Sequence, residues 1–358
     1  MWQIKILMRI YFYHTQNIQH ILSEWQQGKW MGHLLYGATH FKEMGIDVIW
    51  HKFIPNGSRL YKILVTAWRV LKLSNKIDAV FATHYQGIEL LLILHALGLF
   101  RKPIVLWMHQ PILRPHNFLH RFVARLLYKG ADEMLFFSQK IIDDSVKAKM
   151  TNAEKFHIGH WGADLKFYDC LLSEKPQRQG FISSGKEMRD MPTLFKAFAK
   201  TNAIIDAYLP SNGGGVDYTK AIGDSVFPDN IHLHLDSGLT YPQIAAEVNR
   251  HSYVCICCQE TNYTVGLTTV VEALALGIPI LSTRNPQFPF DIDKEGVGIT
   301  MPYYDVDSWV KAINYIESHP REAEEMGHKG RLLAERLYND RQCAEDVTGL
   351  LRKHIQKL

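Results

Sequence analysis

The sequence predicts an α/β protein with two doubly wound parallel sheets, and three observations lead to this fold class. Segments with strand and helix patterns alternate along the whole chain and are joined by short connections. The alternation breaks once, at the polar stretch LLSEKPQRQG (171–180), which separates two complete series. A length of 358 residues suits two domains of ordinary size.

The first half contains about five strand and helix segments. The expected strands are IKILMRIYFYH (4–14), DVIWHKF (47–53), DAVFATHY (78–85), KPIVLWMH (102–109) and DEMLFFS (132–138). The expected helices are Gly32–Met44, closed by Gly45, then Arg59–Lys76, Glu89–Leu99 and Phe118–Lys129, which ends at Gly130.

The second half repeats the pattern. Its expected strands are QGFISSG (179–185), AIIDAYLP (203–210), NIHLHLD (230–236), SYVCICC (252–258) and IPILST (278–283). Helix starts are expected at Asp190, with Pro192 in the first turn, and at the capping box Thr240–Gln243; another helix spans Gly266–Leu276, followed by Gly277. The chain is helical from Ser308 onward. The predicted domains are residues 1–170 and 181–335, with a linker at 171–180 and a C-terminal helix at 336–358 that packs back across the seam.

Composition excludes several classes of protein. With 47% hydrophobic and 21% charged residues, the chain is neither disordered nor a fibre. Its five cysteines have no CxxC spacing, which argues against a disulfide framework and against zinc; three lie in the apolar run YVCICC and are interpreted as buried strand thiols. A reducing, cytoplasmic compartment is therefore expected. No apolar stretch reaches the length of a membrane span, and no signal peptide is expected.

Charge is distributed unevenly. Residues 1–170 hold 21 Lys and Arg against 12 Asp and Glu, a net charge of +9, and the remainder carries −5. A basic half indicates an anionic partner, either nucleic acid or a membrane. Nucleic acid is disfavoured, because no nucleic-acid-binding motif appears and the acidic half would repel a phosphate backbone.

The segment TNYTVGLTTVVEALALGIPILST (261–283) has the pattern of an anion site. A strand is followed by a short loop and a helix whose first turn presents free backbone amides and the positive end of the helix dipole. The residues of this turn are Gly266, Leu267, Thr268 and Thr269. One turn further, Glu272 lies in an otherwise apolar helix and could accept hydrogen bonds from a ribose diol. The alternative is that Thr268 caps the helix and Glu272 is a solvated charge.

A second segment, FISSGKEMRDMPTLFKAF (181–198), joins a strand, a glycine and two cations to a helix. Lys186 follows Gly185, and Arg189 precedes the helix cap. Cations on such a loop can make charge-assisted contacts to a diphosphate leaving group. The alternative is that both are exposed loop charges.

These two segments resemble the donor site of the GT-B glycosyltransferases, in particular the retaining family 4. The family motif is Glu, seven residues, Glu, then a small-residue helix and Gly-x-Pro. Glu272 matches the second Glu, and ALALGIPILST matches the small-residue helix and the Gly-x-Pro. Thr264 stands where the family has its first Glu, which contacts hydroxyls of the transferred sugar. Glu260 could replace that residue only if the loop is rearranged.

The resemblance extends in order over nearly the whole chain, through weaker matches at HIGHWGADLKFY (157–168), GADEMLFFSQ (130–139) and EGVGITMPYYDVDSWVKAI (295–313). It implies two Rossmann-like domains that face a cleft. It also implies that Lys186 and Arg189 neutralise the diphosphate in place of a metal ion, that configuration is retained, and that no cofactor is needed. His109 corresponds to a histidine near the reacting centre, and the loop with Gly28, Gly32 and His33 to a glycine-rich loop over the diphosphate and acceptor.

Two basic stretches of the first half are interleaved with apolar residues. In RLYKILVTAWRVLKLSNK (59–76) the apolar positions recur every three or four residues beside a cationic face made of Arg59, Lys62, Arg69, Lys72 and Lys76, with Trp68 among the apolar residues. Arg114, Arg121, Arg125 and Lys129 accompany Phe118 and Phe122 in the second stretch. Both stretches fit an anionic lipid surface, or else ordinary helices that cover a sheet.

The expected function is therefore a glycosyltransferase that moves a sugar from a UDP- or GDP-sugar to a glycan or lipid-linked acceptor, in surface polysaccharide assembly at the inner face of a membrane. One alternative is a nucleotide-sugar 2-epimerase on the same fold. The other is a catalytically silent homologue that binds nucleotide-sugar or glycan, which the threonine at position 264 favours.

Overall fold

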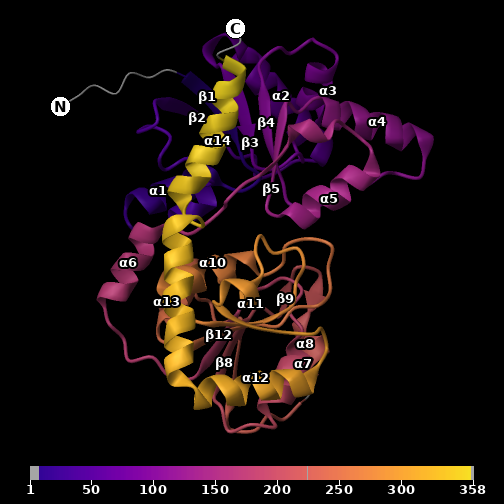
Figure 1. Cartoon of the computed structure of the whole chain (residues 1–358). Coiled ribbons are helices and arrows are strands. Elements are labelled where there is room, and N and C mark those ends of the chain that lie inside the picture. Colours follow the sequence, from indigo (N-terminus) through magenta and orange to yellow (C-terminus); the bar gives the residue numbers. More distant parts are fainter. Residues whose placement is uncertain (1–7, 224, 356–358) are drawn as a thin grey trace, which may run out of the picture. The chain divides into compact units, whose positions relative to one another are not determined.

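The chain folds into two compact α/β units, described here from a computed structural model that covers residues 8–223 and 225–355 (Figure 1). The first unit runs to Trp161 and resumes at Asp340, and the second unit comprises Gly162–Asn339. Residues 4–7 of the first predicted strand and residues 356–358 of the predicted C-terminal helix lie outside the described residues.

The first unit is built on a parallel sheet of six strands in the order β2-β1-β3-β4-β5-β6. The strands are β1 (Met8–Tyr13), β2 (Ile46–Trp50), β3 (Ala79–Ala82), β4 (Ile104–Met108), β5 (Glu133–Phe136) and β6 (Phe156–Ile158). The five predicted strands of the first half are confirmed. Strands β3, β4 and β5 are buried at every position, as expected for a parallel sheet covered on both faces.

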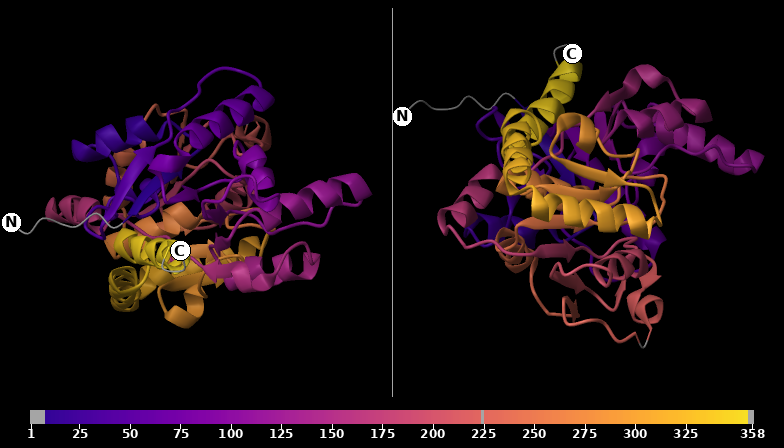
Figure 2. Two further views of the ribbon diagram at one scale, coloured as in Figure 1. Left: turned by 90° about the horizontal axis from the view of Figure 1, so that it is seen from above. Right: turned by 60° about the horizontal axis from the view of Figure 1, so that its bottom comes forward.

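Helices connect these strands. They are α1 (Ile18–Gln26), α2 (Arg59–Lys72), α3 (Glu89–Ala96), α4 (Phe118–Lys129) and α5 (Gln139–Ala148), and the unit is completed by α14 (Asp340–Ile355). Short 3₁₀ turns lie at Gly32–Leu35, Ser74–Lys76 and Ala153–Lys155. Helix α4 packs beside α3 and projects from the unit (Figures 1 and 2).

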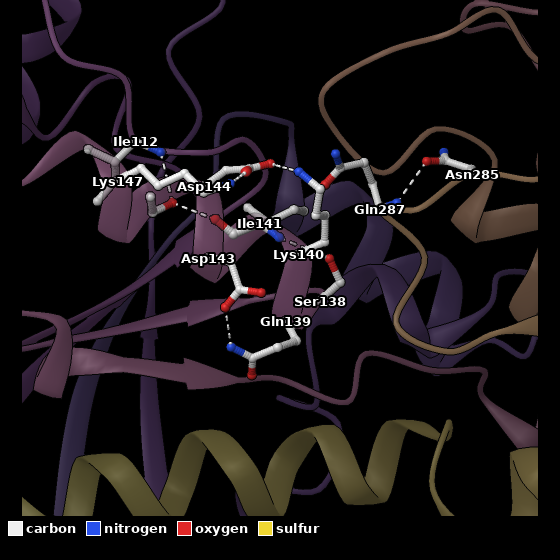
Figure 3. Close-up of polar contacts among 11 residues, drawn as sticks. Ile112, Ser138, Gln139, Lys140, Ile141, Asp143, Asp144, Lys147, Asn285 and Gln287 are labelled. Atoms are coloured by element: carbon white, nitrogen blue, oxygen red, sulfur yellow. Dashed lines mark hydrogen bonds and ion pairs between the residues drawn. The ribbon is translucent and has the colours of Figure 1, made fainter.

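The sequence did not predict α1 and α5, although each begins at a polar cap. Asn17 accepts a hydrogen bond from the amide of His20, and Ser138 accepts one from the amide of Ile141. Figure 3 shows this start of α5 at Ser138 and Ile141. One turn on, the Ser145 hydroxyl donates to the Ile141 carbonyl. The Ser145 hydroxyl in turn accepts from the amide of Ile112, which ties the loop after β4 to α5.

The predicted helix at Gly32–Met44 is wrong. The segment is a 3₁₀ turn at Gly32–Leu35 followed by successive turns up to Gly45. Tyr36 and Gly37 both have positive φ, which an α-helix does not tolerate. Helix α14 packs closely against this segment, because a Cβ on Gly37 would lie only 2.5 Å from the backbone nitrogen of Ala344. Apolar periodicity alone cannot detect this close tertiary contact.

The second unit has a parallel sheet of six strands in the order β11-β8-β7-β12-β13-β14. Its strands are β7 (Phe181–Ser184), β8 (Ile205–Leu209), β11 (Ile231–Leu235), β12 (Tyr253–Ile256), β13 (Ile280–Thr283) and β14 (Gly298–Met301), with a small hairpin of β9 (Asn212–Gly213) and β10 (Val216–Asp217). The helices are α6 (Leu165–Ser173), α7 (Met191–Phe198), α8 (Tyr218–Ile222), α9 (Tyr241–Asn249), α10 (Leu267–Leu276), α11 (Ile292–Glu295), α12 (Val306–Ser318) and α13 (Pro320–Arg336).

The predicted helix signals of this half are confirmed. Asp190 caps α7 by accepting from the amide of Thr193, and Pro192 lies in the first turn. Thr240 and Gln243 form the predicted capping box of α9, and Gly277 ends α10 in the left-handed conformation. The three cysteines of YVCICC are buried free thiols.

The division between the units lies at Trp161/Gly162 and Asn339/Asp340, whereas the sequence indicated a linker at 171–180 and a return near 336. The whole of the expected linker instead belongs to the second unit, and its first three residues are the end of α6 at Ser173. The Ala163 amide donates to the Tyr338 carbonyl, so the entering and leaving segments of the second unit pair there. A Cβ on Gly162 would lie only 1.8 Å from the carbonyl carbon of Tyr338.

Candidate functional site

The N-terminus of α10 is the first part of the candidate site in the second unit. No side chain caps it, and its first backbone bond runs from the Val270 amide to the Gly266 carbonyl. Within the described ranges, the amides of Leu267, Thr268 and Thr269 consequently have no acceptor. Gly266 has φ of 87°, and a Cβ there would meet Ile256 at 2.7 Å, so only glycine fits. Free amides at the positive end of a helix are suited to binding an anion.

Arg189 lies directly beside this helix start. Its side chain is buried, with 3% of its surface exposed. The guanidinium donates to the carbonyls of Ser184 and Glu187, at 3.0–3.2 Å, and contacts the Cys258 sulfur at 3.2 Å and the Thr269 hydroxyl at 3.4 Å. No carboxylate within residues 8–223 and 225–355 forms an ion pair with it. Arg189 is thus a buried cation held by neutral groups.

The two glycines of the predicted motifs meet at this guanidinium. A Cβ on Gly185, whose φ is 127°, would lie 2.1 Å from Nη2, and a Cβ on Gly266 would lie 3.6 Å from Nη1. The loop after β7 is also tied to the loop after β12, because the Gln259 amide donates to the Met188 carbonyl. The fold therefore brings together Gly185, Arg189, Gly266 and Thr269, although Arg189 and Thr269 are 80 positions apart in the sequence.

Lys186 is placed differently from Arg189. It is exposed, and its ammonium lies 5.6 Å from the centre of the Tyr241 ring. Its neighbour Glu187 accepts a hydrogen bond from the Tyr263 hydroxyl at 3.0 Å. The sequence treated Lys186 and Arg189 as an equivalent pair of loop cations, but one is buried beside α10 and the other is solvated.

Glu272 is buried on α10, one turn past the free amides, with 5% of its surface exposed. Burial raises the pKa of Glu272 to about 7, against the opposing effects of a hydrogen bond from Tyr168 and the charge of Arg189. Tyr168 belongs to α6, which packs on α10. Glu272 is therefore not a solvated helix charge, and its predicted contact with a ribose stays a prediction.

The position of the missing family glutamate is occupied by a structural threonine. The Thr264 hydroxyl donates to the Gln287 carbonyl at 3.0 Å, and Figure 3 shows the adjoining bond from the Gln287 amide to the Asn285 side chain. Glu260 has an exposed side chain, and its amide donates to the Tyr304 hydroxyl at 3.2 Å. Thr264 thus fixes the loop before α10 but contributes no carboxylate.

In the first unit, His109 follows β4 and is surrounded by rings. Its Nε2 is hydrogen-bonded to the Tyr36 hydroxyl at 3.0 Å, and its ring stacks on Phe137. The His84 ring lies 4.1 Å away, edge to face. Burial, together with the neighbouring histidines His84 and His14, holds the pKa of His109 well below 6.5. At neutral pH this side chain is therefore uncharged.

His109 is one of four histidines that follow neighbouring strands, and sequence reasoning missed the other three. His51, His14 and His109 directly follow β2, β1 and β4, and His84 lies two positions after the end of β3. These strands are adjacent in the order β2-β1-β3-β4 in the sheet. Burial lowers the pKa of His14 to about 3, and that of His51 and of His84 to about 4. The signal in the sequence was the recurrence of histidine at the ends of predicted strands.

The glycine-rich loop of the first unit is open at one end and buried at the other. Gly28 is exposed, and a Cβ there would meet nothing within 4 Å. Gly32 and His33 are buried, and the His33 carbonyl accepts from the Trp161 indole at 2.9 Å. Burial lowers the pKa of His33 to about 4. The loop is thus anchored at His33.

Helices α2 and α4 expose large apolar side chains. On α2 these are Leu60, Tyr61, Leu64, Trp68 and Leu71, and on α4 they are Phe118, Leu119, Phe122 and Val123. The Lys72 ammonium lies 5.3 Å from the centre of the Trp68 ring. The other predicted surface cations are engaged locally: Arg59 pairs with Glu89, Lys62 donates to the Pro55 carbonyl, and Arg69 to the Lys52 carbonyl. Lys76 is exposed in the turn after α2.

The described residues lack a membrane-spanning helix and a cluster of metal ligands. No helix there is both long enough and apolar enough to cross a bilayer. No group of three or more histidine, cysteine, aspartate or glutamate side chains within these residues is arranged to hold a metal ion.

The two sheets and their helices match solved structures over nearly the entire chain. Sucrose-phosphate synthase from Thermosynechococcus elongatus superimposes with a TM-score of 0.72 at 13% identity, covering 98% of this chain and 100% of that one. Anabaena HepE, in complex with UDP and glucose, superimposes with a TM-score of 0.66 at 15% identity, covering 96% and 99%. The chain thus has the GT-B fold, as the resemblance in its sequence implied.

Sequence comparison gives a match over part of the chain. No family model matches the chain. A curated relative, the MMP alpha-(1->4)-mannosyltransferase of Mycolicibacterium hassiacum, is 22% identical over 262 residues. This match spans 70% of the present chain but only 61% of the relative.

Proposed function

We propose that the protein is a glycosyltransferase that takes a sugar from a nucleotide-diphosphate donor held by the second unit. The observation that carries the proposal is the pairing of Arg189 with the start of α10. A buried guanidinium without a carboxylate partner among the described residues lies beside three backbone amides without acceptors there. A diphosphate would complement both.

In this proposal each group of the site has a defined task. The amides of α10 and the Arg189 guanidinium bind the diphosphate and stabilise the negative charge that develops on it as the sugar leaves. Ser184 and Glu187 already fix the orientation of the Arg189 guanidinium, whose positive charge attracts the diphosphate. The exposed Lys186 closes over the phosphates once they are bound. Glu272 accepts hydrogen bonds from the ribose.

The finer parts of the proposal rest on the sequence resemblance. Retention of configuration, independence from metal ions and membership of family 4 are inferred from the donor segment around Glu272 and the loop around Lys186. The relative's name and the UDP of the HepE structure are compatible with a nucleotide-sugar donor. Neither fixes the sugar.

We further propose a glycan or lipid-linked acceptor and a site of action at the cytoplasmic face of a membrane. The exposed apolar side chains of α2 and α4 support this, because they lie among cations on the half of the chain with net charge +9. Cations draw a protein to anionic lipid, and apolar side chains then enter the interface.

Calorimetric titration of the whole chain with UDP, GDP and their sugars tests the donor site. We expect one nucleoside diphosphate to bind, and Arg189→Met to remove that binding. Lys42→Gln, which alters an exposed lysine of the first unit, is the control and should bind normally. Absence of binding by all these ligands would overturn the proposal.

A second candidate is a catalytically silent nucleotide-sugar-binding homologue, and Thr264 favours it because no carboxylate stands at that position. Incubation with donor and a panel of acceptors distinguishes the two. Sugar transfer or slow donor hydrolysis excludes the silent homologue, and epimerised donor formed without acceptor would indicate an epimerase instead.

A further inference from the structure

The first unit contains a cavity that the donor site does not use. It has a volume of about 420 Å³ and lies at the carboxyl ends of β1 and β2. Tyr13, His14, His51 and Phe53 line it from the strand side, and Arg59 and Lys62 from α2. This volume lies in the range of small-ligand pockets.

The two histidines of this cavity are neutral, and each uses only its Nδ1 atom in a hydrogen bond within the described residues. The Gln16 amide donates to Nδ1 of His14, and a backbone amide can only donate. Nδ1 is therefore the acceptor, and the proton of the neutral ring lies on Nε2. Nδ1 of His51 is bonded to the Tyr11 hydroxyl at 2.8 Å. Neither Nε2 has a partner among residues 8–223 and 225–355, although both side chains are only 4% exposed.

The two cations of the cavity differ in how their charge is balanced. Arg59 forms an ion pair with Glu89 at 2.8 Å, so its charge is compensated. Lys62 donates only to the Pro55 carbonyl, at 3.4 Å, and has no carboxylate partner in the part of the chain that the structure describes. Because the histidines are neutral, the cavity presents one net positive charge.

Helix α2 connects the cavity to the exposed apolar surface. Arg59, Lys62 and Thr66 face the cavity and recur at a spacing of three and four residues. Leu60, Leu64 and Trp68 recur at a spacing of four on a different side and are at least half exposed. One helix thus borders a polar, cationic cavity and presents an apolar, solvent-exposed surface.

We propose that this cavity binds the sugar phosphate part of the acceptor, with sugar hydroxyls on His14 and His51, a ring against Tyr13 or Phe53, and the phosphate on Lys62. The proposal rests on the proposed glycosyltransferase function, whose acceptor it specifies. The sugar phosphate is either soluble or the head of a lipid-linked saccharide, whose chain would then lie along the exposed side of α2.

Equilibrium binding of mannose 1-phosphate, mannose and inorganic phosphate to the whole chain tests the proposal. Mannose 1-phosphate should bind at least about tenfold more tightly than either fragment, because charged hydrogen bonds and sugar contacts then act together. Lys62→Gln should remove the preference for mannose 1-phosphate over mannose, and His51→Phe should weaken the binding of both ligands. Lys42→Gln and His116→Gln alter residues of the same unit outside the cavity and should change nothing.

The proposal would be overturned if Lys62→Gln and the unchanged chain bound mannose 1-phosphate equally tightly. It would also be overturned if the unchanged chain did not prefer mannose 1-phosphate to inorganic phosphate. Titration of the unchanged chain with UDP and GDP separates the two hypotheses: binding of neither nucleotide, with intact sugar phosphate binding, refutes only the donor site. Competition by mannosyl phosphate linked to a polyprenol in vesicles identifies the source. If the polyprenol-linked compound displaces a bound probe at a lower concentration than free mannose 1-phosphate does, the natural ligand is the lipid-linked form. If free mannose 1-phosphate displaces the probe at the lower concentration, the natural ligand is the soluble form.

Discussion

The carboxyl ends of the two sheets carry opposite chemistry. In the first unit, which has most of the excess positive charge, four largely buried and neutral histidines follow adjacent strands. In the second unit, which is acidic overall, the corresponding edge holds a buried arginine and uncapped amides. Net charge therefore does not predict the electrostatics of a site. The first edge is suited to hydrogen bonding with neutral hydroxyls, and the second to holding an anion.

The largest difference between the two units is expected in how their stability responds to acidification. Folding lowers the pKa of His14, His51, His84 and His109 below 6.5, so unfolded chains take up protons first as pH falls. The first unit should lose stability between about pH 6.5 and pH 4, by roughly 2–3 kcal/mol for each of His14, His51 and His84. Burial raises the pKa of Glu272 to about 7, so its contribution has the opposite sign and is lost as pH rises through 7.

Hydrogen exchange at pH 7 and pH 5, corrected for the intrinsic pH dependence of exchange, measures the local stability of both units in one sample. Peptides from β1, β3 and β4 should lose protection at pH 5, and those from α10 should not. Equal loss in both units would show that the histidines do not govern the response.

Displacing the Arg189 guanidinium should have the next largest effect, a loss of sugar transfer. Gly185→Ala places a methyl group 2.1 Å from the guanidinium and at an unfavourable φ. Transfer should fall by roughly 10²–10³-fold, or about 2.7–4 kcal/mol, as for other lost oxyanion donors. Gly215→Ala is the matched control, since Gly215 also has positive φ but open space around it. Comparable activity in the two variants would remove Arg189 from the site.

Glu272→Gln should have an intermediate effect. The substitution keeps the shape but removes the ionisable proton, so the variant should match the unchanged chain in stability at about pH 4 and exceed it at pH 8. If Glu272 holds the ribose, UDP affinity should fall about tenfold, and discrimination against 2′-deoxy-UDP should shrink. Unfolding of the variant, or unchanged UDP affinity, would assign Glu272 a purely structural role with Tyr168.

The smallest effect per residue is expected at the surface of α2. Each Lys or Arg near anionic lipid contributes about 1 kcal/mol, and salt should weaken it. Replacing Arg69, Lys72 and Lys76 with Glu should abolish low-salt sedimentation with anionic vesicles and leave UDP binding intact. The same charge change at Lys220, Lys294 and Lys311 of the second unit is the control. Equal sedimentation with neutral vesicles, or none with either, would contradict the membrane proposal.

The sequence predicted the elements whose signals are local. The start of α10 was placed within one residue, because Gly266 and Gly277 bracket an apolar run. Asp190 and Thr240 marked helix starts through their own side chains. The helix proposed at Gly32–Met44 failed because the close approach of α14 to Gly37 is a contact between distant segments.

The candidate site was predicted in part for the same reason. Gly185, Arg189 and Gly266 were identified from two separate segments, but the burial of Arg189 depends on Ser184, Cys258 and Thr269 surrounding it in three dimensions. His109 was identified singly, whereas the row of histidines becomes visible only when the order of strands in the sheet is known.

The return of α14 to the first unit also affects the order in which the two units can be completed during synthesis. A ribosome delivers all of residues 162–339 before α14 emerges, so the second unit can fold while the first still lacks its last helix. Ala344, Val347 and Leu351 of that helix are fully buried. Until translation passes them, the nascent first unit displays an apolar surface to chaperones and proteases. Premature termination anywhere in the second unit therefore yields an incomplete first unit, even though its first 161 residues are all present.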